Sequence, residues 1–117
     1  MIDRRKQARQ RLVALTVVLD EASGEVLGQV GNLTLEGIMI CSDRPLKIDQ
    51  IYSLQIELPD EVDGRPRLSV LARSLWCLRV SNPTHYATGF ELLNLENADK
   101  RVIELVIRDA IFQRWTS

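Results

Sequence analysis

Two short groups of residues hold the side chains in this sequence that are best suited to bind an anionic ligand. They are residues 4–9 (RRKQAR) and residues 32–37 (NLTLEG). Arg5 and Arg9 stand four residues apart, and a guanidinium is a planar fork of donors that binds phosphate bidentately or hydrogen-bonds a guanine edge. The second group offers the Asn32 amide, the Thr34 hydroxyl and Gly37, whose missing side chain lets backbone approach a ligand closely. Together the two groups predict a binding site.

Catalysis is a poor interpretation of the remaining polar residues. An enzyme needs a poised acid–base pair, an activated nucleophile or a metal cluster. His85 is the single histidine and lies in an expected turn, with no cysteine or paired carboxylate near it in the sequence. Asp60, Glu61 and Asp63 cluster in an expected polar turn that lacks the spacing of a calcium loop. We expect a protein that is not an enzyme and that holds no metal.

The cysteines and the apolar runs indicate a cytoplasmic protein. Cys41 and Cys77 lie in apolar stretches without a neighbouring Cys or His at metal-ligand spacing, so we expect two buried, reduced thiols and no disulfide framework. The longest uncharged apolar runs, such as residues 12–19, are far shorter than the roughly 18 residues needed to cross a bilayer. We therefore expect no membrane insertion.

The charges are distributed unevenly along the chain. Residues 1–11 hold five basic residues and one acidic residue, a net charge of +4, so the other 106 residues carry −5 of the overall −1. A basic arm on an acidic body indicates an anionic partner held locally by the arm, or a solvated tail tethered to its own body. A binder of duplex DNA would be basic overall, and a binder of single strands would show several exposed aromatic residues, whereas the aromatic content is 5%. We expect neither DNA nor RNA as a partner.

Hydrophobic periodicity predicts an all-β core followed by one helix. Alternating or β-branched runs bounded by turn residues predict strands, interrupted by residues 31–37 and ended at Pro59. The expected strands are residues 12–20, about 25–30, 38–41, 51–58, 68–80 and 86–93. From Ala98 to Trp115 the apolar residues repeat every four, which predicts a helix with Asn97 as its N-cap. Since no helices alternate with the strands, we expect a small antiparallel barrel or sandwich.

The length of 117 residues supports one domain, which we divide into a flexible basic arm (residues 1–11) and a β-barrel body (residues 12–117) with its helix at about 97–115. The apolar face of the helix is wider than one barrel mouth needs. It is therefore a candidate surface for a partner protein or for a homodimer.

Taken in order, the two groups resemble the signature of the PilZ domain, a bacterial receptor module for the second messenger cyclic di-GMP. That signature is RxxxR followed some twenty to thirty residues later by [D/N]xSxxG. Here RxxxR is Arg5 to Arg9, and residues 32–37 stand as NxTxxG. Trp76 and the later Gly89-Phe90-Glu91 are similar to elements of the family's last strand pair. The resemblance implies a six-stranded antiparallel β-barrel of the split-barrel type with a C-terminal helix.

The resemblance also implies roles for individual residues. Arg5 and Arg9 would grip guanine and phosphate, while Asn32 and Thr34 would hydrogen-bond the other face of a guanine. Gly37 would shape the turn. Each has a structural alternative: a solvated basic tail for the arginines, a turn residue for Asn32 and a bulge glycine for Gly37. Thr34 replaces the usual serine, and its methyl group restricts χ1, so we expect binding that is retained but weaker.

Two further residues belong to the expected site. Arg4 adds positive charge beside the motif and is a candidate contact for a second ligand molecule, or a solvated side chain. Trp76 offers a surface on which a purine can stack, although a tryptophan in a strand is more often part of the core.

The resemblance implies a bacterial receptor or adaptor that binds cyclic di-GMP, changes the conformation of its arm and signals in trans to a downstream protein. Motility, biofilm and virulence control are the outputs of this family. The competing hypothesis is a PilZ-fold adaptor that acts without nucleotide, which would normally lack RxxxR.

Overall fold

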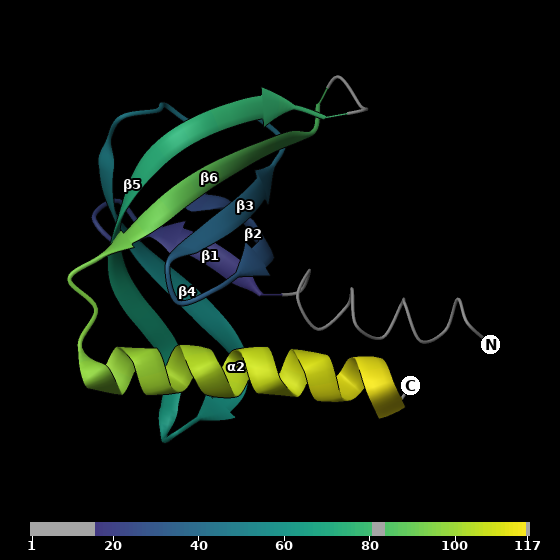
Figure 1. Ribbon diagram of the computed structural model, residues 1–117. Coiled ribbons are helices and arrows are strands. Elements are labelled where there is room, and N and C mark those ends of the chain that lie inside the picture. Colours follow the sequence, from purple (N-terminus) through teal and green to yellow (C-terminus); the bar gives the residue numbers. More distant parts are fainter. Residues whose placement is uncertain (1–15, 81–83, 117) are drawn as a thin grey trace.

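The computed structural model describes residues 16–80 and 84–116, with side chains described as far as Arg108 except for Pro59. In this described part of the chain, six strands precede one helix (Figure 1). They are β1 (Val17–Asp20), β2 (Val26–Leu33), β3 (Gly37–Ser42), β4 (Ile51–Val62), β5 (Arg65–Arg79), β6 (Tyr86–Leu93) and α2 (Asn97–Thr116). All neighbouring strands are antiparallel and close into a barrel in the order β1-β2-β3-β6-β5-β4. The predicted fold class, an antiparallel six-stranded barrel with a C-terminal helix, is confirmed.

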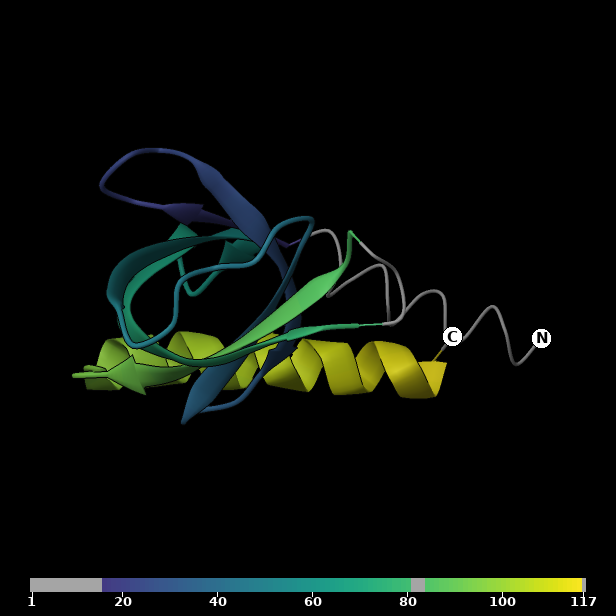
Figure 2. The ribbon, with the colours of Figure 1, turned by 90° about the horizontal axis from the view of Figure 1, so that it is seen from above.

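The barrel interior is filled by the inward-facing members of the alternating strands. Val18, Ile40 and Leu54 are completely buried, and the aliphatic core they belong to extends into the helix. Val102 and Ile103 of α2 are also completely buried, and the helix packs against β4 and β5 (Figures 1 and 2). These two residues open the two four-residue repeats that predicted the helix. The periodicity therefore identified the face of α2 that closes the barrel.

The start of α2 differs by one residue from the prediction. The Glu96 carbonyl accepts the first helical hydrogen bond, from the Lys100 N–H at 3.0 Å, so the N-cap is Glu96 and Asn97 lies in the first turn. The Glu96 N–H donates to the Asp99 carboxylate at 3.2 Å, and the Arg65 guanidinium donates to the same carboxylate at 3.0 Å. The Asp99 carboxylate, at the third helical position, thus caps the helix and also ties it to β5. The sequence analysis had assigned the capping role to Asn97.

β2 and β4 continue past residues that were expected to interrupt or end them, because the strand pairing is irregular at these residues. β2 continues through Gly31 to Leu33, with a register shift between Val30 and Asn32. β4 continues past Pro59 to Val62, with a register shift between Glu57 and Val62. Proline is tolerated in a strand at such an irregularity, where a ladder hydrogen bond is already missing. The expected end of the strand at Pro59 was therefore wrong.

The structure also bears on the predictions for the two cysteines and for membrane-spanning segments. The expectation of two buried thiols was wrong: Cys41 is exposed and Cys77 is partly exposed, and both are free. Within the described residues, no helix is long and apolar enough to span a membrane.

Candidate functional site

The structure places the second predicted group but not the first, because Arg4, Arg5 and Arg9 lie outside the described residues. The described chain begins at Thr16, a buried residue whose carbonyl accepts the Val30 N–H at 2.9 Å. Val30 lies two residues before Asn32 on β2. The first described residue therefore lies beside the strand on which the second group begins.

The turn between β2 and β3 is built around the Thr34 side chain. The Thr34 hydroxyl accepts the Glu36 N–H at 3.2 Å and the Gly37 N–H at 3.1 Å, while the Thr34 N–H donates to the Gly37 carbonyl at 2.9 Å. A hydroxyl that accepts backbone N–H groups two and three residues ahead is the typical side-chain cap of a tight turn. Thr34 therefore organises the turn whose ligand-binding role the resemblance implied.

Gly37 is required by the neighbouring strand. A Cβ atom at Gly37 would lie 2.6 Å from the Phe90 carbonyl oxygen on β6, far inside van der Waals contact. The turn is held to β6 on its other side as well, because the Leu92 N–H donates to the Glu36 carbonyl at 2.9 Å. Gly37 therefore allows the backbones of the turn and β6 to approach closely, while its predicted approach to a ligand stays a prediction.

Strand register places Asn32 and Trp76 in one transverse row on the outer surface of the barrel. Asn32 pairs with Met39 on β3, Met39 pairs with Gly89 on β6, and Gly89 pairs with Trp76 on β5. Directly paired residues point to the same face of a sheet. At about 4.8 Å between strands, the row spans about 14 Å between the outer two backbones. Two predicted site residues, 44 positions apart in sequence, therefore face the same side.

Trp76 lies against the glycine next to it in this row. A Cβ atom at Gly89 would lie 2.2 to 2.5 Å from three atoms of the Trp76 indole, so the ring covers Gly89. Trp76 nevertheless keeps 40% of its surface exposed, whereas Gly89 is buried. The side chain is therefore neither a core residue nor a free one. It presents an exposed aromatic surface supported by the strand beneath it, as stacking of a planar base requires.

Sulfur-containing side chains cover the bulge beside Asn32. A Cβ atom at Gly31 would lie 2.7 Å from both the Met39 Cε and the Cys41 Sγ. Sequence analysis singled out neither Gly31 nor Met39. The only signal for them is the strand pairing, which places Met39 between Asn32 and Gly89 and which a single sequence does not show.

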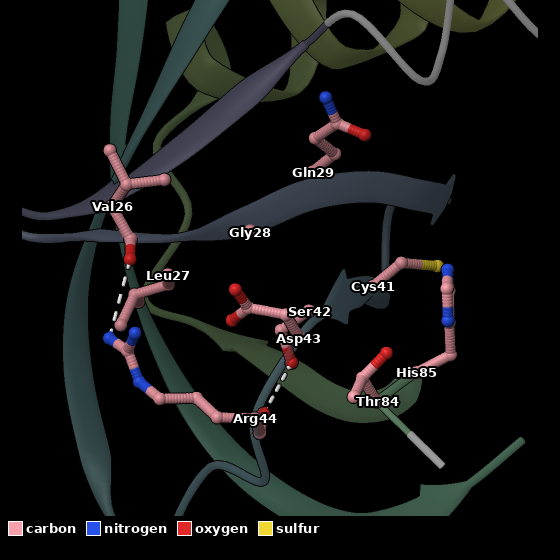
Figure 3. A pocket seen from close by; sticks show the side chains of 10 residues that line it. All are labelled: Val26, Leu27, Gly28, Gln29, Cys41, Ser42, Asp43, Arg44, Thr84 and His85. Carbon is pink, nitrogen blue, oxygen red and sulfur yellow. Dashed lines mark hydrogen bonds between the residues drawn. The ribbon is translucent and has the colours of Figure 1, made fainter. Parts of the chain in front are cut away.

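A separate hollow lies at the opposite end of β2. It has a volume of about 450 Å³ and is lined by ten residues from the start of β2, the end of β3 and the segment before β6 (Figure 3). They include Gln29, Asp43, Arg44 and His85. Of the predicted site residues that the structure describes, none lines this hollow. His85 is exposed and lines this hollow together with Cys41 (Figure 3).

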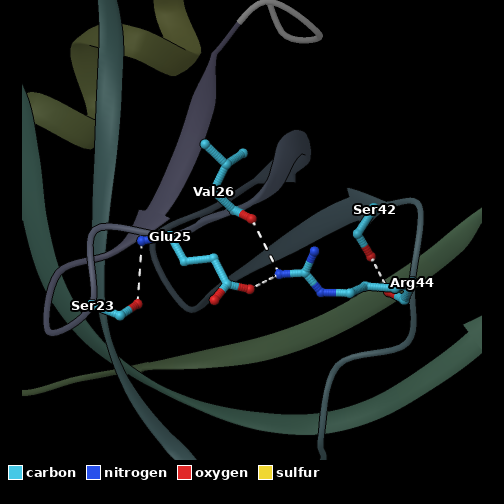
Figure 4. A network of polar contacts seen from close by, with 5 residues as sticks. All are labelled: Ser23, Glu25, Val26, Ser42 and Arg44. Atoms are coloured by element: carbon cyan, nitrogen blue, oxygen red, sulfur yellow. Dashed lines mark hydrogen bonds and ion pairs between the residues drawn. The ribbon is translucent and has the colours of Figure 1, made fainter.

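The wall of this hollow is fixed by a polar network. The Arg44 guanidinium forms an ion pair with Glu25 and donates to the Val26 carbonyl at 3.4 Å (Figure 4). The Ser42 hydroxyl donates to the Arg44 carbonyl at 2.7 Å. These contacts join the loop after β3 to the start of β2. Because Arg44 is engaged with a carboxylate, it is not a free cation for an anionic ligand.

The titratable and metal-ligating groups give no sign of a catalytic centre in the described part of the chain. Burial raises the pKa of the Tyr52 phenol above its ordinary value of 10.0, and the hydrogen bond to the Lys47 carbonyl opposes this shift. Tyr52 packs edge-on against Phe90 at 5.5 Å between ring centroids, away from the outer row. No cluster of three or more His, Cys, Asp or Glu side chains arranged to hold a metal occurs among the residues that the structure describes.

Comparison with known proteins identifies relatives of the whole unit. A family model described as the PilZ domain matches residues 3–109, a range that includes both predicted groups. The solved structure of the Bacillus subtilis inhibitor of motility (MotI/DgrA) is similar, with a TM-score of 0.62 and 16% sequence identity over 85% of this chain. The similarity covers 47% of that chain, so this chain spans about half its length. At this identity the likeness shows the fold. The search of curated proteins found no match.

Proposed function

The chain belongs to the PilZ domain family, and we propose from this that it is a cyclic di-GMP receptor that passes the signal to a partner protein in trans. The family match covers the barrel, most of the helix and the arginine motif. PilZ domains are binding and adaptor modules, and cyclic di-GMP is the ligand of the family. What this chain itself binds depends on its own residues.

The observation that carries the proposal is the position of Asn32. It stands at one end of an outward row that ends at the exposed ring of Trp76, and two residues from Val30, where the chain enters the barrel. A flat purine and a phosphate need an amide, an aromatic surface and guanidinium groups on the same face. The row supplies the first two, and the entry point of the arm lies beside it.

The arginines of the arm have enough chain to reach this face. Arg9 lies seven positions before Thr16, and seven extended residue steps span at most about 25 Å. The row itself is about 14 Å across. Arg9 can therefore reach any position along it, and Arg5 stands four residues further along the chain. Arg4 lies beside Arg5 and would meet a second nucleotide or solvent.

We assign the turn residues different tasks within the bound complex. Asn32 is exposed, and its amide is a donor and acceptor for a guanine edge. The Thr34 hydroxyl also donates to the Gly37 carbonyl at 3.4 Å, so a hydrogen bond from this hydroxyl to a nucleotide would compete with the turn itself. Gly37 keeps the turn close to β6. For nucleotide binding, the Thr34 methyl group then matters less than the hydroxyl that holds the turn.

Binding would act as a switch without chemistry. Cyclic di-GMP carries two phosphates, and an arm of net charge +4 folded onto it would create a composite surface of ligand, arm and barrel. Ordering a segment costs about 1 kcal/mol or more per residue fixed, so several charge-assisted hydrogen bonds are needed to offset it. The partner that reads this surface belongs to motility, biofilm or virulence control in a bacterial cytoplasm. Because the similar solved structure is that of an inhibitor of motility, motility proteins are the first class to test.

The test is isothermal titration of the purified chain with cyclic di-GMP, with GTP and cyclic AMP as controls. We expect saturable binding of one or two cyclic di-GMP molecules per chain, lost in Arg9→Ala and in Arg5→Ala. Arg101→Ala is the matched control, because it also removes one positive charge but from the ion pair with Asp63 at the β4–β5 turn. Both arm variants should melt at the temperature of the unaltered chain. Equal binding by Arg9→Ala and Arg101→Ala would contradict the proposal.

A nucleotide-independent adaptor is the alternative that this titration separates. It is favoured if the chain shows no heat with cyclic di-GMP and an unchanged melting temperature in its presence. The RxxxR motif argues against it, because an adaptor that binds no nucleotide has no need of both arginines.

A further inference from the structure

Exposed large apolar side chains gather on one region of the barrel. Nine such residues occur in the described chain, and two of them, Val26 and Leu35, lie elsewhere. The other seven lie on β5, just after it, or in the segment that pairs with it; we call this set the β5 face. Its members are Ile48, Ile51, Leu71, Leu75, Trp76, Leu78 and Val80. Single exposed apolar residues are ordinary on a protein surface, whereas a contiguous set marks an interaction site.

Register and hydrogen bonds show that these residues are neighbours. Ile51 pairs with Arg73 of β5, and the Ser74 N–H donates to the Gln50 carbonyl at 2.9 Å, so the segment 48–51 runs alongside the middle of β5. Leu75 is the bulged residue between Ser74 and Trp76. The bulge turns both Leu75 and Trp76 outward, with exposures of 50% and 40%. The apolar residues therefore lie along β5 and the segment beside it, with Arg73 between Leu71 and Leu75. The C-terminal end of β5 lies away from α2 (Figure 1).

Strand pairing limits how the β5 face can be covered. β4 pairs with β5 at residues 65–73 and β6 pairs with it at residues 71–79, so a strand cannot add at residues 71–73, where both edges are occupied. The outward side chains can instead be covered by a partner that packs against the face of the ribbon, as sheets pack in a sandwich. From Leu71 to Val80 the β5 face is about 30 Å long at about 3.3 Å per residue.

The charges of the β5 face are complementary to those of the same face on a second copy. In the outward rows from Leu71 to Leu78, the charged side chains of the described chain are Arg73 and Glu91. Their separation of 4.0 Å is the longest of the five ion pairs, and both side chains are nearly half exposed. Each is therefore weakly engaged within its own chain. A two-fold axis through this region would bring the Arg73 of each copy to the Glu91 of the other.

The available surface is of the size that a dimer needs. A standard interface takes about a tenth of a small protein's surface, which is about 750 Å² of the 7518 Å² here. A stripe about 30 Å long and three strands wide, with seven large apolar residues, is of that order. With Asp49 and Arg79, which are also exposed within these segments, the charges of the face number two positive and two negative, so a partner with a strongly charged surface would not be matched by it.

We propose that the β5 face is a homodimer interface, through which two copies of this chain pack sheet against sheet about a two-fold axis. Leu75 and Leu78 lie at the centre of the contact, and Arg73 and Glu91 form reciprocal ion pairs across it. This interface differs from the helix surface that the sequence offered for a dimer. It does not depend on nucleotide binding, and it predicts that the ligand-free chain associates.

The first test is sedimentation equilibrium of the full chain without nucleotide, over rising protein concentration. We expect the average mass to rise from 13.3 kDa to twice that value. Leu78→Ser should raise the dimer dissociation constant at least about tenfold, as truncation of a central apolar residue does. Val26→Ser is the matched control, because Val26 is 52% exposed on β2 and lies outside the β5 face. A chain that stays monomeric throughout, or a dimer unaffected by Leu78→Ser, would overturn the proposal.

The second test uses charge reversal to show that the contact lies between chains. Arg73→Glu alone and Glu91→Arg alone each place like charges together, so each variant should dimerise at least about tenfold more weakly. Mixing the two variants restores opposite charges at both pairs, and the mixture should form a heterodimer. A mixture that remains monomeric would refute the two-fold arrangement. Circular dichroism melting of each variant checks that the barrel is intact. Because no nucleotide is present, failure here leaves the proposed receptor function untouched.

Discussion

Replacing Gly89 with alanine tests the support of Trp76 by the strand beneath it. The new methyl carbon would lie 2.2 Å from Trp76 Cε2, 2.4 Å from Nε1 and 2.5 Å from Cζ2. Real contacts at a Cβ atom are not shorter than 3 Å, so the indole must leave its place or β6 must shift. Because the ring is the far end of a side chain on a ribbon surface, we expect the ring to move.

The size of the effect follows from the surface that Trp76 buries. Trp76 is 40% exposed, so about 60% of a side chain that contributes about 200 Å² lies out of water, or about 120 Å². At about 25 cal/mol per Å², losing that contact costs about 3 kcal/mol. Alanine in place of glycine restores about 0.5 to 1 kcal/mol through reduced backbone entropy. Gly89→Ala should therefore lower the free energy of unfolding by about 2 kcal/mol.

The assay is a double-mutant cycle by urea denaturation, with Gly89→Ala, Trp76→Ala and the double variant. In a chain without the indole, the methyl group meets nothing in its way, so Gly89→Ala should then stabilise the fold by about 0.5 to 1 kcal/mol through reduced backbone entropy. The expected coupling energy is therefore about 3 kcal/mol. Additive effects of the two substitutions would refute the reasoning. The same Gly89→Ala variant should also bind cyclic di-GMP more weakly if a guanine stacks on Trp76, since stacking contributes about 1 to 3 kcal/mol per base.

Substitutions at three further positions test the β2–β3 turn, the cap of α2 and the partly buried Tyr52 phenol. Thr34→Val removes the acceptor of the β2–β3 turn and should cost about 1 kcal/mol in urea denaturation, while Thr34→Ser should cost a few tenths; equal losses would contradict the hydroxyl's role. Asp99→Asn should cost about 1 kcal/mol in thermal unfolding, because it weakens both the cap of α2 and the ion pair with Arg65, and an unchanged melting temperature would argue against both. Because burial raises the pKa of Tyr52, the folded chain favours the neutral phenol, so stability is retained below pH 10.0 and lost as pH rises through the higher folded pKa. Tyr52→Phe should therefore flatten the alkaline loss of stability more than Tyr86→Phe does.

The features readable from the sequence were those set by local periodicity. Alternation in residues 51–58 marked the start of β4, and the four-residue repeat beginning at Val102 and Ile103 marked the buried face of α2. Both patterns arise because one face of an element is buried while the other meets water. The apolar run at residues 86–93, next to an expected turn, marked β6 with its observed bounds. The same logic led to the fold class, since an uninterrupted series of strands before one helix leaves few ways to bury every apolar face.

The features missed were those that depend on pairing between distant strands. Pro59 looks like the end of a strand when only its sequence neighbours are considered, yet the register shift in the β4–β5 pair absorbs it. Met39 carries no polar group and matches no motif, and its position between Asn32 and Gly89 follows only from the register of β3. The expected burial of Cys41 failed for a related reason. An apolar run does not reveal which alternate residues face outward.

The closed topology explains why both proposed contacts lie on the outside of the barrel. Six strands enclose a space that side chains such as Ile40, Leu54 and Ile56 fill, and every strand of the described barrel pairs with two neighbours. A ligand or partner therefore meets mainly the outward faces of the strands. Trp76 belongs both to the row that begins at Asn32 and to the β5 face. A nucleotide bound to the row and a second copy bound to the β5 face would then both contact the Trp76 ring. By thermodynamic linkage, nucleotide binding would change the dimer affinity by the same factor as dimerisation changes the nucleotide affinity. Titrating cyclic di-GMP into the dimer and into monomeric Leu78→Ser measures that factor directly. Equal affinities for the two forms would show that the surfaces are independent.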